Sequence, residues 1–145
     1  MNEITEIEQA IQNSFNEYFP NAWSFINVRN SFGKEHISIN FGLVDKSELT
    51  SRILENDPVF HTFVIHNEGA GKYEAVNVQS GIKINPVNPM YAMDRVKTKF
   101  RKTTGDSKRI IRTFDTFFKR LKVLVNEHES NIYQRKGYSD KYLKL

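Results

Sequence analysis

The chain contains 145 residues, of which 39% are hydrophobic and none is cysteine, and its formal net charge is +4. This length suits one hydrophobic core, so we expect residues 1–145 to form a single domain. The absence of cysteine excludes disulfide scaffolds, thiolate metal sites, iron–sulfur sites and cysteine nucleophiles.

The N-terminal segment is acidic and amphipathic. It lacks the basic and apolar regions of a secretory signal, and no window reaches the roughly 20 apolar residues that span a bilayer. We therefore expect a cytoplasmic protein without a membrane partner. Apolar residues recur at spacings of three and four from Ile4 to Tyr18, which predicts a helix over residues 3–19 that ends at Pro20.

The segment after this helix changes to a period of two. Apolar and polar residues alternate between Trp23 and Val44, and residues 30–35 have turn composition, so this segment predicts a β-hairpin. Asp45 and Glu48 then have the spacing of a capping pair, which predicts a short helix after the hairpin.

A second hairpin is expected in the middle of the chain. Residues 59–66 are rich in β-branched and aromatic side chains, as in a central strand, and residues 73–79 return after a turn at 67–72. Residues 85–89 contain two prolines, which prevent regular strand pairing and predict an irregular loop.

The last regular elements are a strand and a long helix. Residues 95–103 alternate again, and Asp106 is placed to cap a helix that runs to about Glu127. The order of the elements predicts an α+β fold. We expect a mainly antiparallel sheet of five or six strands, with the N-terminal and long C-terminal helices packed on one face.

Charge is distributed unevenly along this chain. Residues 1–94 contain 6 basic and 12 acidic residues, whereas residues 95–145 contain 15 basic and 5 acidic ones. Residues 95–122 alone contain 11 basic and 2 acidic residues. Such a concentration of positive charge indicates a polyanionic partner for this part of the protein.

The predicted strand over 95–103 would align its cations. Residues two apart share a face, so Arg95, Lys97, Lys99 and Arg101 would form a row with a spacing of about 6.6 Å. This spacing is close to that of successive phosphates in an extended nucleic-acid strand. The alternative is an exposed edge strand whose lysines prevent aggregation.

The predicted long helix combines a broad apolar arc with a basic outer face, which only Asp115 interrupts. Hydroxyl groups, a glycine and cations surround its first residue, an arrangement that suits a phosphate at a helix N-terminus. Asp106 would repel such an anion, so we favour an ordinary cap there. The basic residues of this helix are Lys108, Arg109, Arg112, Lys119, Arg120 and Lys122.

The C-terminal tail, residues 131–145, interleaves tyrosines with cations. Tyr133 and Tyr138 are suited to stack on bases, while Arg135 and Lys136 are suited to contact phosphates. The alternative is a segment that packs its tyrosine and leucine side chains on the domain.

Enzyme motifs are incomplete. Residues 69–72 lack the upstream glycine and the following Ser or Thr of a phosphate-binding loop, and His36 begins a His-x-Ser pattern that lacks its second copy. Five residues separate His61 from His66, which places them on opposite faces of a strand and argues against a shared metal site. We expect no cofactor and no metal.

The leading hypothesis is a non-catalytic nucleic-acid-binding accessory protein, with single strands favoured, that contacts the phosphate backbone through residues 95–122. One alternative is a protein-binding module or inhibitor whose basic surface docks on an acidic protein. Another is a small metal-independent nuclease that uses His36 or His61 as a base. The predicted binding residues are Arg95, Lys97, Lys99, Arg101, Lys102, Lys108, Arg109, Arg112, Lys119, Tyr133, Arg135, Lys136 and Tyr138.

Overall fold

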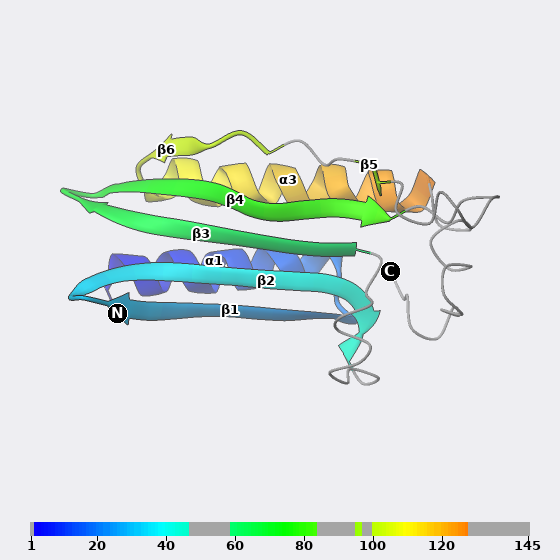
Figure 1. The fold of residues 1–145 in the computed structure, drawn as a ribbon, viewed down its shortest axis with the longest axis horizontal. Coiled ribbons are helices and arrows are strands. Elements are labelled where there is room, and N and C mark those ends of the chain that lie inside the picture. Colours follow the sequence, from blue (N-terminus) through cyan, green and yellow to red (C-terminus); the bar gives the residue numbers. More distant parts are fainter. Residues whose placement is uncertain (1, 47–58, 84–94, 97–99, 128–145) are drawn as a thin grey trace.

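The computed structural model describes residues 2–46, 59–83, 95–96 and 100–127. It contains an antiparallel sheet of six strands with one helix before it and one after it (Figure 1). The α+β fold predicted from the sequence is therefore confirmed. The elements in chain order are α1 (Glu3–Tyr18), β1 (Ala22–Ser31), β2 (Lys34–Asp45), β3 (Val59–Gly69), β4 (Lys72–Lys83), β5 (Arg95–Val96), β6 (Thr103–Gly105) and α3 (Ser107–Glu127).

The sheet is a meander with the strand order β1-β2-β3-β4-β5, and β6 also pairs with β4. Both predicted hairpins are present. Their turns are tighter than the sequence suggested, because Ser31 already pairs with Lys34, and Gly69 with Lys72. The first turn contains Phe32 and Gly33, whose φ angles of 53° and 79° are both left-handed, as a two-residue hairpin loop requires.

Both helices contact the same face of the sheet. The Phe15 ring of α1 lies 4.9 Å from the Phe41 ring of β2, and the Phe114 ring of α3 lies 5.3 Å from the Phe63 ring of β3. The helices also contact each other, since the rings of Phe15 and Phe118 are 5.4 Å apart. The hydrophobic core therefore lies between the helices and this face, and we call the opposite face of the sheet its outer face (Figure 1).

The prediction of one continuous strand over residues 95–103 is wrong. Residues 95–96 form β5, residues 100–102 are outside any strand, and residues 103–105 form β6. The cause lies at Phe100, whose ring packs 4.8 Å from the ring of Phe63 in the core. Burying this ring takes the backbone around it out of the hydrogen-bonded ladder.

Other predicted elements fall outside the described residues. They are the short helix after Asp45, the proline loop at 85–89 and the tail at 131–145. Asp45 itself is the last residue of β2. Among the described helices, none is both long and apolar enough to cross a membrane.

His61 and His66 lie on opposite faces of β3, as the sequence predicted. His66 is exposed on the outer face, whereas His61 is 0% exposed and its ring stacks on that of Phe41 at 4.8 Å. Burial lowers the pKa of His61 from its ordinary value of 6.5 to about 3. The folded protein therefore keeps this imidazole neutral in mildly acidic solution.

This burial makes stability depend on pH. Below about pH 6.5 the unfolded chain protonates His61 but the folded chain does not, so the free energy of unfolding falls as the pH falls. We expect a loss of about 2 kcal/mol between about pH 7 and about pH 5. Urea unfolding at both pH values measures it, and His61→Phe should remove most of the loss. His66→Gln, at the exposed histidine of the same strand, should retain it; a loss of equal size in His61→Phe would contradict this assignment.

Candidate anion-binding groove

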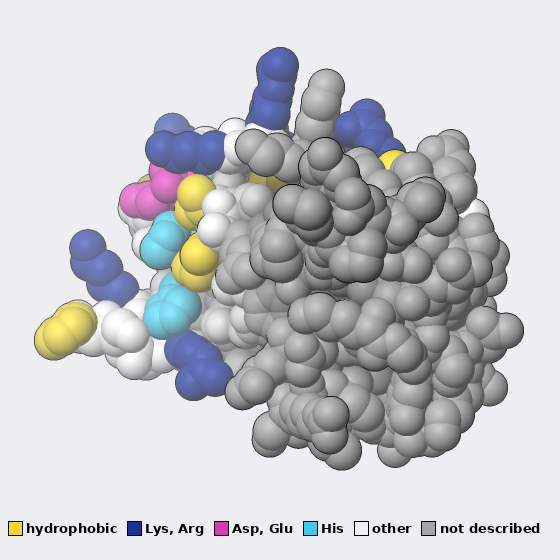
Figure 2. Space-filling model, turned by 45° about the vertical axis from the view of Figure 1, so that its right-hand side comes forward, with side chains coloured by type: hydrophobic (Ala, Val, Ile, Leu, Met, Phe, Trp, Pro, Cys, Tyr) yellow, Lys and Arg dark blue, Asp and Glu magenta, His cyan; other side chains and the backbone are white. Residues whose placement is uncertain are grey.

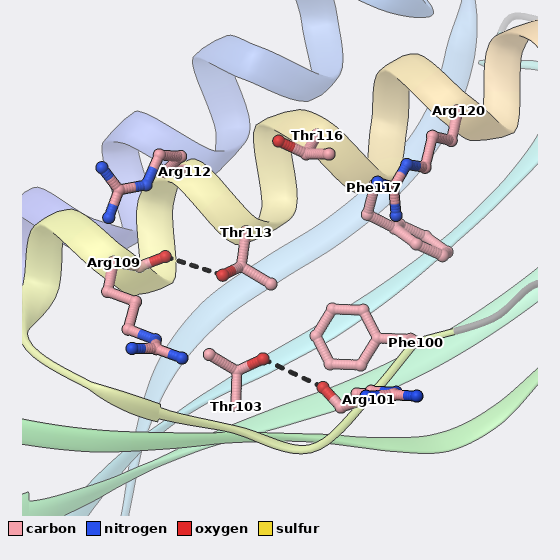
Figure 3. Close-up of a pocket in the computed structure, with 9 residues that line it drawn as sticks. All are labelled: Phe100, Arg101, Thr103, Arg109, Arg112, Thr113, Thr116, Phe117 and Arg120. Atoms are coloured by element: carbon pink, nitrogen blue, oxygen red, sulfur yellow. Dashed lines mark hydrogen bonds between the residues drawn. The ribbon is translucent and has the colours of Figure 1, made fainter.

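A groove with a volume of about 550 Å³ lies between α3 and the segment that leads into β6 (Figure 3). We call it the arginine groove, because four of its nine described lining residues are arginines and three are threonines. None of these nine residues is acidic. They are Phe100, Arg101, Thr103, Arg109, Arg112, Thr113, Thr116, Phe117 and Arg120.

Helix α3 supplies most of this lining through its periodicity. Arg109, Thr113, Thr116 and Arg120 recur at spacings of four, three and four, so they form one stripe along the helix. At a rise of about 1.5 Å per residue, Arg109 and Arg120 start about 16 Å apart along the axis. The stripe therefore presents positive charge at both ends of an elongated groove.

The helix begins next to the groove, and its first turn is capped. The backbone N–H of Arg109 donates to Asp106 Oδ1 at 2.9 Å, which confirms the predicted cap. The carboxylate thus occupies the place that a phosphate would take at this helix N-terminus. Any anion in the arginine groove is therefore bound by side chains of the stripe and not by the helix end.

Two aromatic rings lie beneath the arginines. The rings of Phe100 and Phe117 are 5.5 Å apart and edge-on, and Phe117 is buried (Figure 3). Phe117 is part of the core and Phe100 is partly buried against it, and each ring also contacts Phe63. An apolar floor lowers the local dielectric constant below that of water and so strengthens the attraction of a guanidinium group for an anion.

Two of the threonine hydroxyl groups have backbone partners. Thr103 Oγ1 donates to the carbonyl oxygen of Arg101 at 2.9 Å, and Thr113 Oγ1 donates to that of Arg109 at 2.8 Å (Figure 3). These bonds hold the two hydroxyl protons, so the guanidinium groups remain the donors for a ligand. A guanidinium group offers a planar fork of N–H donors that matches a phosphate or carboxylate.

Gly105 leaves room for the Arg109 side chain. A Cβ atom at position 105 would lie 2.5 Å from Arg109 Cδ and 3.2 Å from Arg109 Cγ, which are shorter than van der Waals distances allow. The absence of a side chain at position 105 therefore permits this position of the Arg109 side chain.

Replacing Gly105 by alanine should push Arg109 away from this position. We expect the affinity for an anionic oligomer to fall about fivefold, because one charge-assisted contact is displaced. Fluorescence anisotropy measures the affinity, and urea unfolding tests whether the fold is retained. Thr104→Ala, at the exposed neighbouring residue of β6, is the control. Unchanged affinity of Gly105→Ala would show that binding does not depend on the space that Gly105 leaves for the Arg109 side chain.

The structure brings together only part of the predicted binding set. Arg101, Arg109 and Arg112 line the arginine groove. Lys102 does not, because its Nζ pairs with Glu74 Oε2 at 3.5 Å. Lys108 and Lys119 are exposed on α3 but do not line the groove either.

The remaining predicted residues are not placed. Lys97, Lys99 and the tail residues lie outside the described part of the chain, and Arg95 is described only as the first residue of β5. Arg101 lies outside any strand, so the expected row of four cations on one strand is not formed. Nothing in the structure tests the expected stacking by the tail. The tail residues concerned are Tyr133, Arg135, Lys136 and Tyr138.

Asp115 does not interrupt the groove. Its Oδ1 accepts a hydrogen bond from Ser14 Oγ at 2.7 Å, and its Oδ2 accepts one from Tyr18 at 3.5 Å. The residue therefore lies between α1 and α3, which corrects its expected place on the basic outer face. A helical wheel shows on which side of its own helix a residue lies, but it does not show which neighbouring element packs against that side.

The sequence prediction missed the polar residues between the arginines. Thr113 and Thr116 were not selected, although together with Arg109 and Arg120 they show a regular helical spacing. This spacing was a usable signal, because threonine is a poor helix former and two half-buried copies on one stripe are unusual. Phe100 alternates with the cations, so the sequence placed it on the opposite face, but its contact with Phe63 could not be predicted from this segment alone.

The structure argues against His61 as a general base. The side chain is fully buried, and burial holds its pKa near 3, so it meets neither solvent nor substrate at the surface. In the part of the chain that is described, no group of three or more His, Asp or Glu side chains is arranged to hold a metal ion. Residues 69–72 form the turn between β3 and β4.

No protein-family model, curated protein or solved structure matches this chain.

Proposed function

We propose that the protein is a non-catalytic nucleic-acid-binding protein that holds the phosphate backbone of a single strand in the arginine groove. The observation that carries this proposal is that four arginine residues line one groove whose described lining has no carboxylate. Arginine stays charged at any physiological pH, and its fork binds phosphate oxygens through two parallel hydrogen bonds.

The length of the groove supports a chain of phosphates over a single one. Arg109 and Arg120 start about 16 Å apart along α3. Successive phosphates of an extended strand are about 6 Å apart, so this distance corresponds to about three phosphates. A ligand with one phosphate would engage only one end of the groove.

The shape of the groove favours a single strand. Its volume of about 550 Å³ lies between one helix and one chain segment, so a single backbone fits lengthwise. A duplex is too wide to enter and would present only one of its backbones. No base-specific contact is needed for such binding, because phosphates are the same in every sequence.

Salt dependence tests the proposal directly. We expect a labelled single-stranded oligonucleotide of about 12 residues to bind, with log K falling against log salt with a slope of about −2 to −3. This slope corresponds to three or four phosphate contacts at about −0.7 each. Fluorescence anisotropy at several salt concentrations, with a duplex of the same length alongside, measures it. Absence of binding at low salt would disprove the proposal.

Poly-glutamate is the competitor that separates a nucleic acid from an acidic protein partner. If the groove binds a phosphate backbone, poly-glutamate with the same number of charges should displace the oligonucleotide only at much higher concentration. Equal competition by poly-glutamate would instead favour docking on an acidic protein, because carboxylates also fit guanidinium forks.

A further inference from the structure

The tip of the β1–β2 hairpin exposes a large aromatic side chain. Phe32 is 106% exposed and has a φ angle of 53°, a left-handed conformation that non-glycine residues adopt at an energetic cost. The turn is otherwise polar, and the Asn30 side chain accepts a hydrogen bond from the N–H of Gly33 at 3.1 Å. Phe32 thus contributes nothing to the core, although it is one of the most hydrophobic side chains in the protein.

The β1–β2 hairpin exposes a second aromatic ring on its outer face. Residues on β1 and β2 that pair with each other and point away from the helices form four cross-strand pairs, which we call the outer hairpin face. Phe25 is 48% exposed on this face. The four pairs are Phe25 with Asn40, Asn27 with Ser38, Arg29 with His36, and Ser31 with Lys34.

The four pairs of the outer hairpin face contain cations but no carboxylate. Arg29 and Lys34 are exposed. Glu35 and Glu68 line a hollow together with Lys34 and His36 beside these pairs. His36 pairs with His66 on the next strand, and Figure 2 shows two histidine side chains next to each other on the surface. The same view shows a hydrophobic side chain projecting at one end of the molecule, near lysine and arginine side chains.

This combination fits the chemistry of a nucleic-acid strand. Aromatic rings stack on bases, amide and hydroxyl side chains bond to base edges, and cations contact the phosphates between them. A lipid surface or an acidic protein would bind to the cations, but neither requires side-chain amides next to an aromatic ring. The outer face of a sheet also presents these groups on a rigid support.

We propose that the outer hairpin face, together with Phe32 at the tip of the hairpin, is a base-binding surface for single-stranded nucleic acid. Phe25 and Phe32 stack on bases, and Arg29 and Lys34 contact the adjacent phosphates. The inference rests on the proposed function and adds to it the part of the ligand that the arginine groove does not recognise. The two surfaces are distinct, since β1 is one edge of the sheet and β6 pairs with β4 near the other.

The two surfaces face different sides of the sheet, because the arginine groove lies next to α3 and the outer hairpin face points away from the helices. One strand has to pass around an edge of the sheet to contact both surfaces, so each surface is tested with its own variants.

An abasic oligonucleotide with the same number of phosphates separates base contacts from backbone contacts. We expect wild-type protein to bind the intact strand about tenfold more tightly than the abasic one.

Variants of the two phenylalanines test the base contacts. Phe32→Ala should weaken binding of the intact strand about fivefold and leave binding of the abasic strand unaffected. The double variant Phe25→Ala with Phe32→Ala should remove most of the difference in affinity between the two strands. Phe32→Trp should restore affinity, and its new fluorescence should be quenched on binding. Val78→Ala, at another exposed apolar residue, is the matched control.

The outcomes distinguish the two surfaces. If the Phe25 and Phe32 variants bind the intact strand as wild type does, the base-binding surface is refuted, whereas salt-dependent binding would still support the arginine groove. If these variants lose binding to vesicles with anionic lipids but not to the intact strand, the surface is a membrane anchor and the inference is equally refuted. If arginine replacements in the groove have no effect while Phe32→Ala does, the groove proposal fails and the hairpin proposal stands.

Discussion

Replacing Arg109 and Arg120 together by glutamine is expected to weaken binding of a single-stranded oligonucleotide about 100-fold at low salt. Each replacement removes one charge-assisted hydrogen-bonding group from the arginine groove, and such a group contributes roughly 1.5 kcal/mol or more. The slope of log K against log salt should become less steep by about 1.4, because two phosphate contacts are lost at about −0.7 each. Anisotropy titrations at several salt concentrations measure both quantities.

The chain provides a matched control for this experiment. Lys108 and Lys119 have the same spacing as Arg109 and Arg120 on the same helix, one residue earlier, and both are exposed. Neither lines the groove. Replacing this pair by glutamine removes the same net charge, so we expect a decrease of about threefold or less from the weaker general field.

The comparison of the two pairs has one decisive result. If both double variants lose affinity equally, binding depends on total charge and not on the groove. Glutamine preserves much of the length and helix propensity of arginine and lysine, so a difference in folding is not expected. Far-UV circular dichroism of the wild type and the two double variants verifies this.

Phe63→Ala is expected to destabilise the fold by about 3 to 5 kcal/mol. Phe63 is 0% exposed, and its ring lies within 4.8 to 6.1 Å of the rings of Phe41, His61, Phe100, Phe114 and Phe117. Truncation leaves a cavity at the point where the sheet, α3 and the segment before β6 meet. Urea unfolding with an unchanged m-value measures the loss.

The same substitution at the hairpin tip is the control. Phe32→Ala removes an identical side chain that is 106% exposed, so the free energy of unfolding should change by about 0.5 kcal/mol or less. Similar losses at the two positions would contradict the proposed core. Phe63→Ala should also weaken oligonucleotide binding, because Phe63 supports Phe100 and Phe117 at the floor of the arginine groove.

Asp115 shows how the contact between α1 and α3 affects which charges line the arginine groove. In the sequence, this carboxylate is the one acidic residue on a basic helix face, and it would weaken any anion site there. In the structure, Ser14 and Tyr18 of α1 both donate hydrogen bonds to it. The α1–α3 contact therefore holds this carboxylate outside the lining of the arginine groove and uses it to join the two helices.

Local periodicity was sufficient to predict the fold class and most elements. The apolar stripe from Ile4 to Phe15 predicted α1, because a period near 3.6 buries one side of a helix. Alternation predicted the first hairpin, and a run of β-branched and aromatic residues followed by a turn predicted the second. The position of Asp106 predicted the start of α3. Each of these features depends on neighbours within a few residues, so the sequence contains the whole signal.

Local periodicity failed at residues 95–103, where alternation alone predicted one long strand with a row of cations. Cations and other residues do alternate in this segment, but the chain places Phe100 against Phe63 instead of continuing the strand pairing with β4. That competition involves residues far apart in the chain, which alternation cannot detect. For the same reason, the groove that Arg101 forms with α3 could not be derived from either segment alone.

The sequence by itself determined that positive charge is concentrated in residues 95–122 and that these residues include a long amphipathic helix. Only the tertiary structure decided which cations act together. Arg101, Arg109, Arg112 and Arg120 share a groove, whereas Lys102 pairs with Glu74 and Lys108 and Lys119 lie outside it. The physical reason is that charge and helical period follow from local sequence, but the convergence of side chains depends on how separate elements pack on one core.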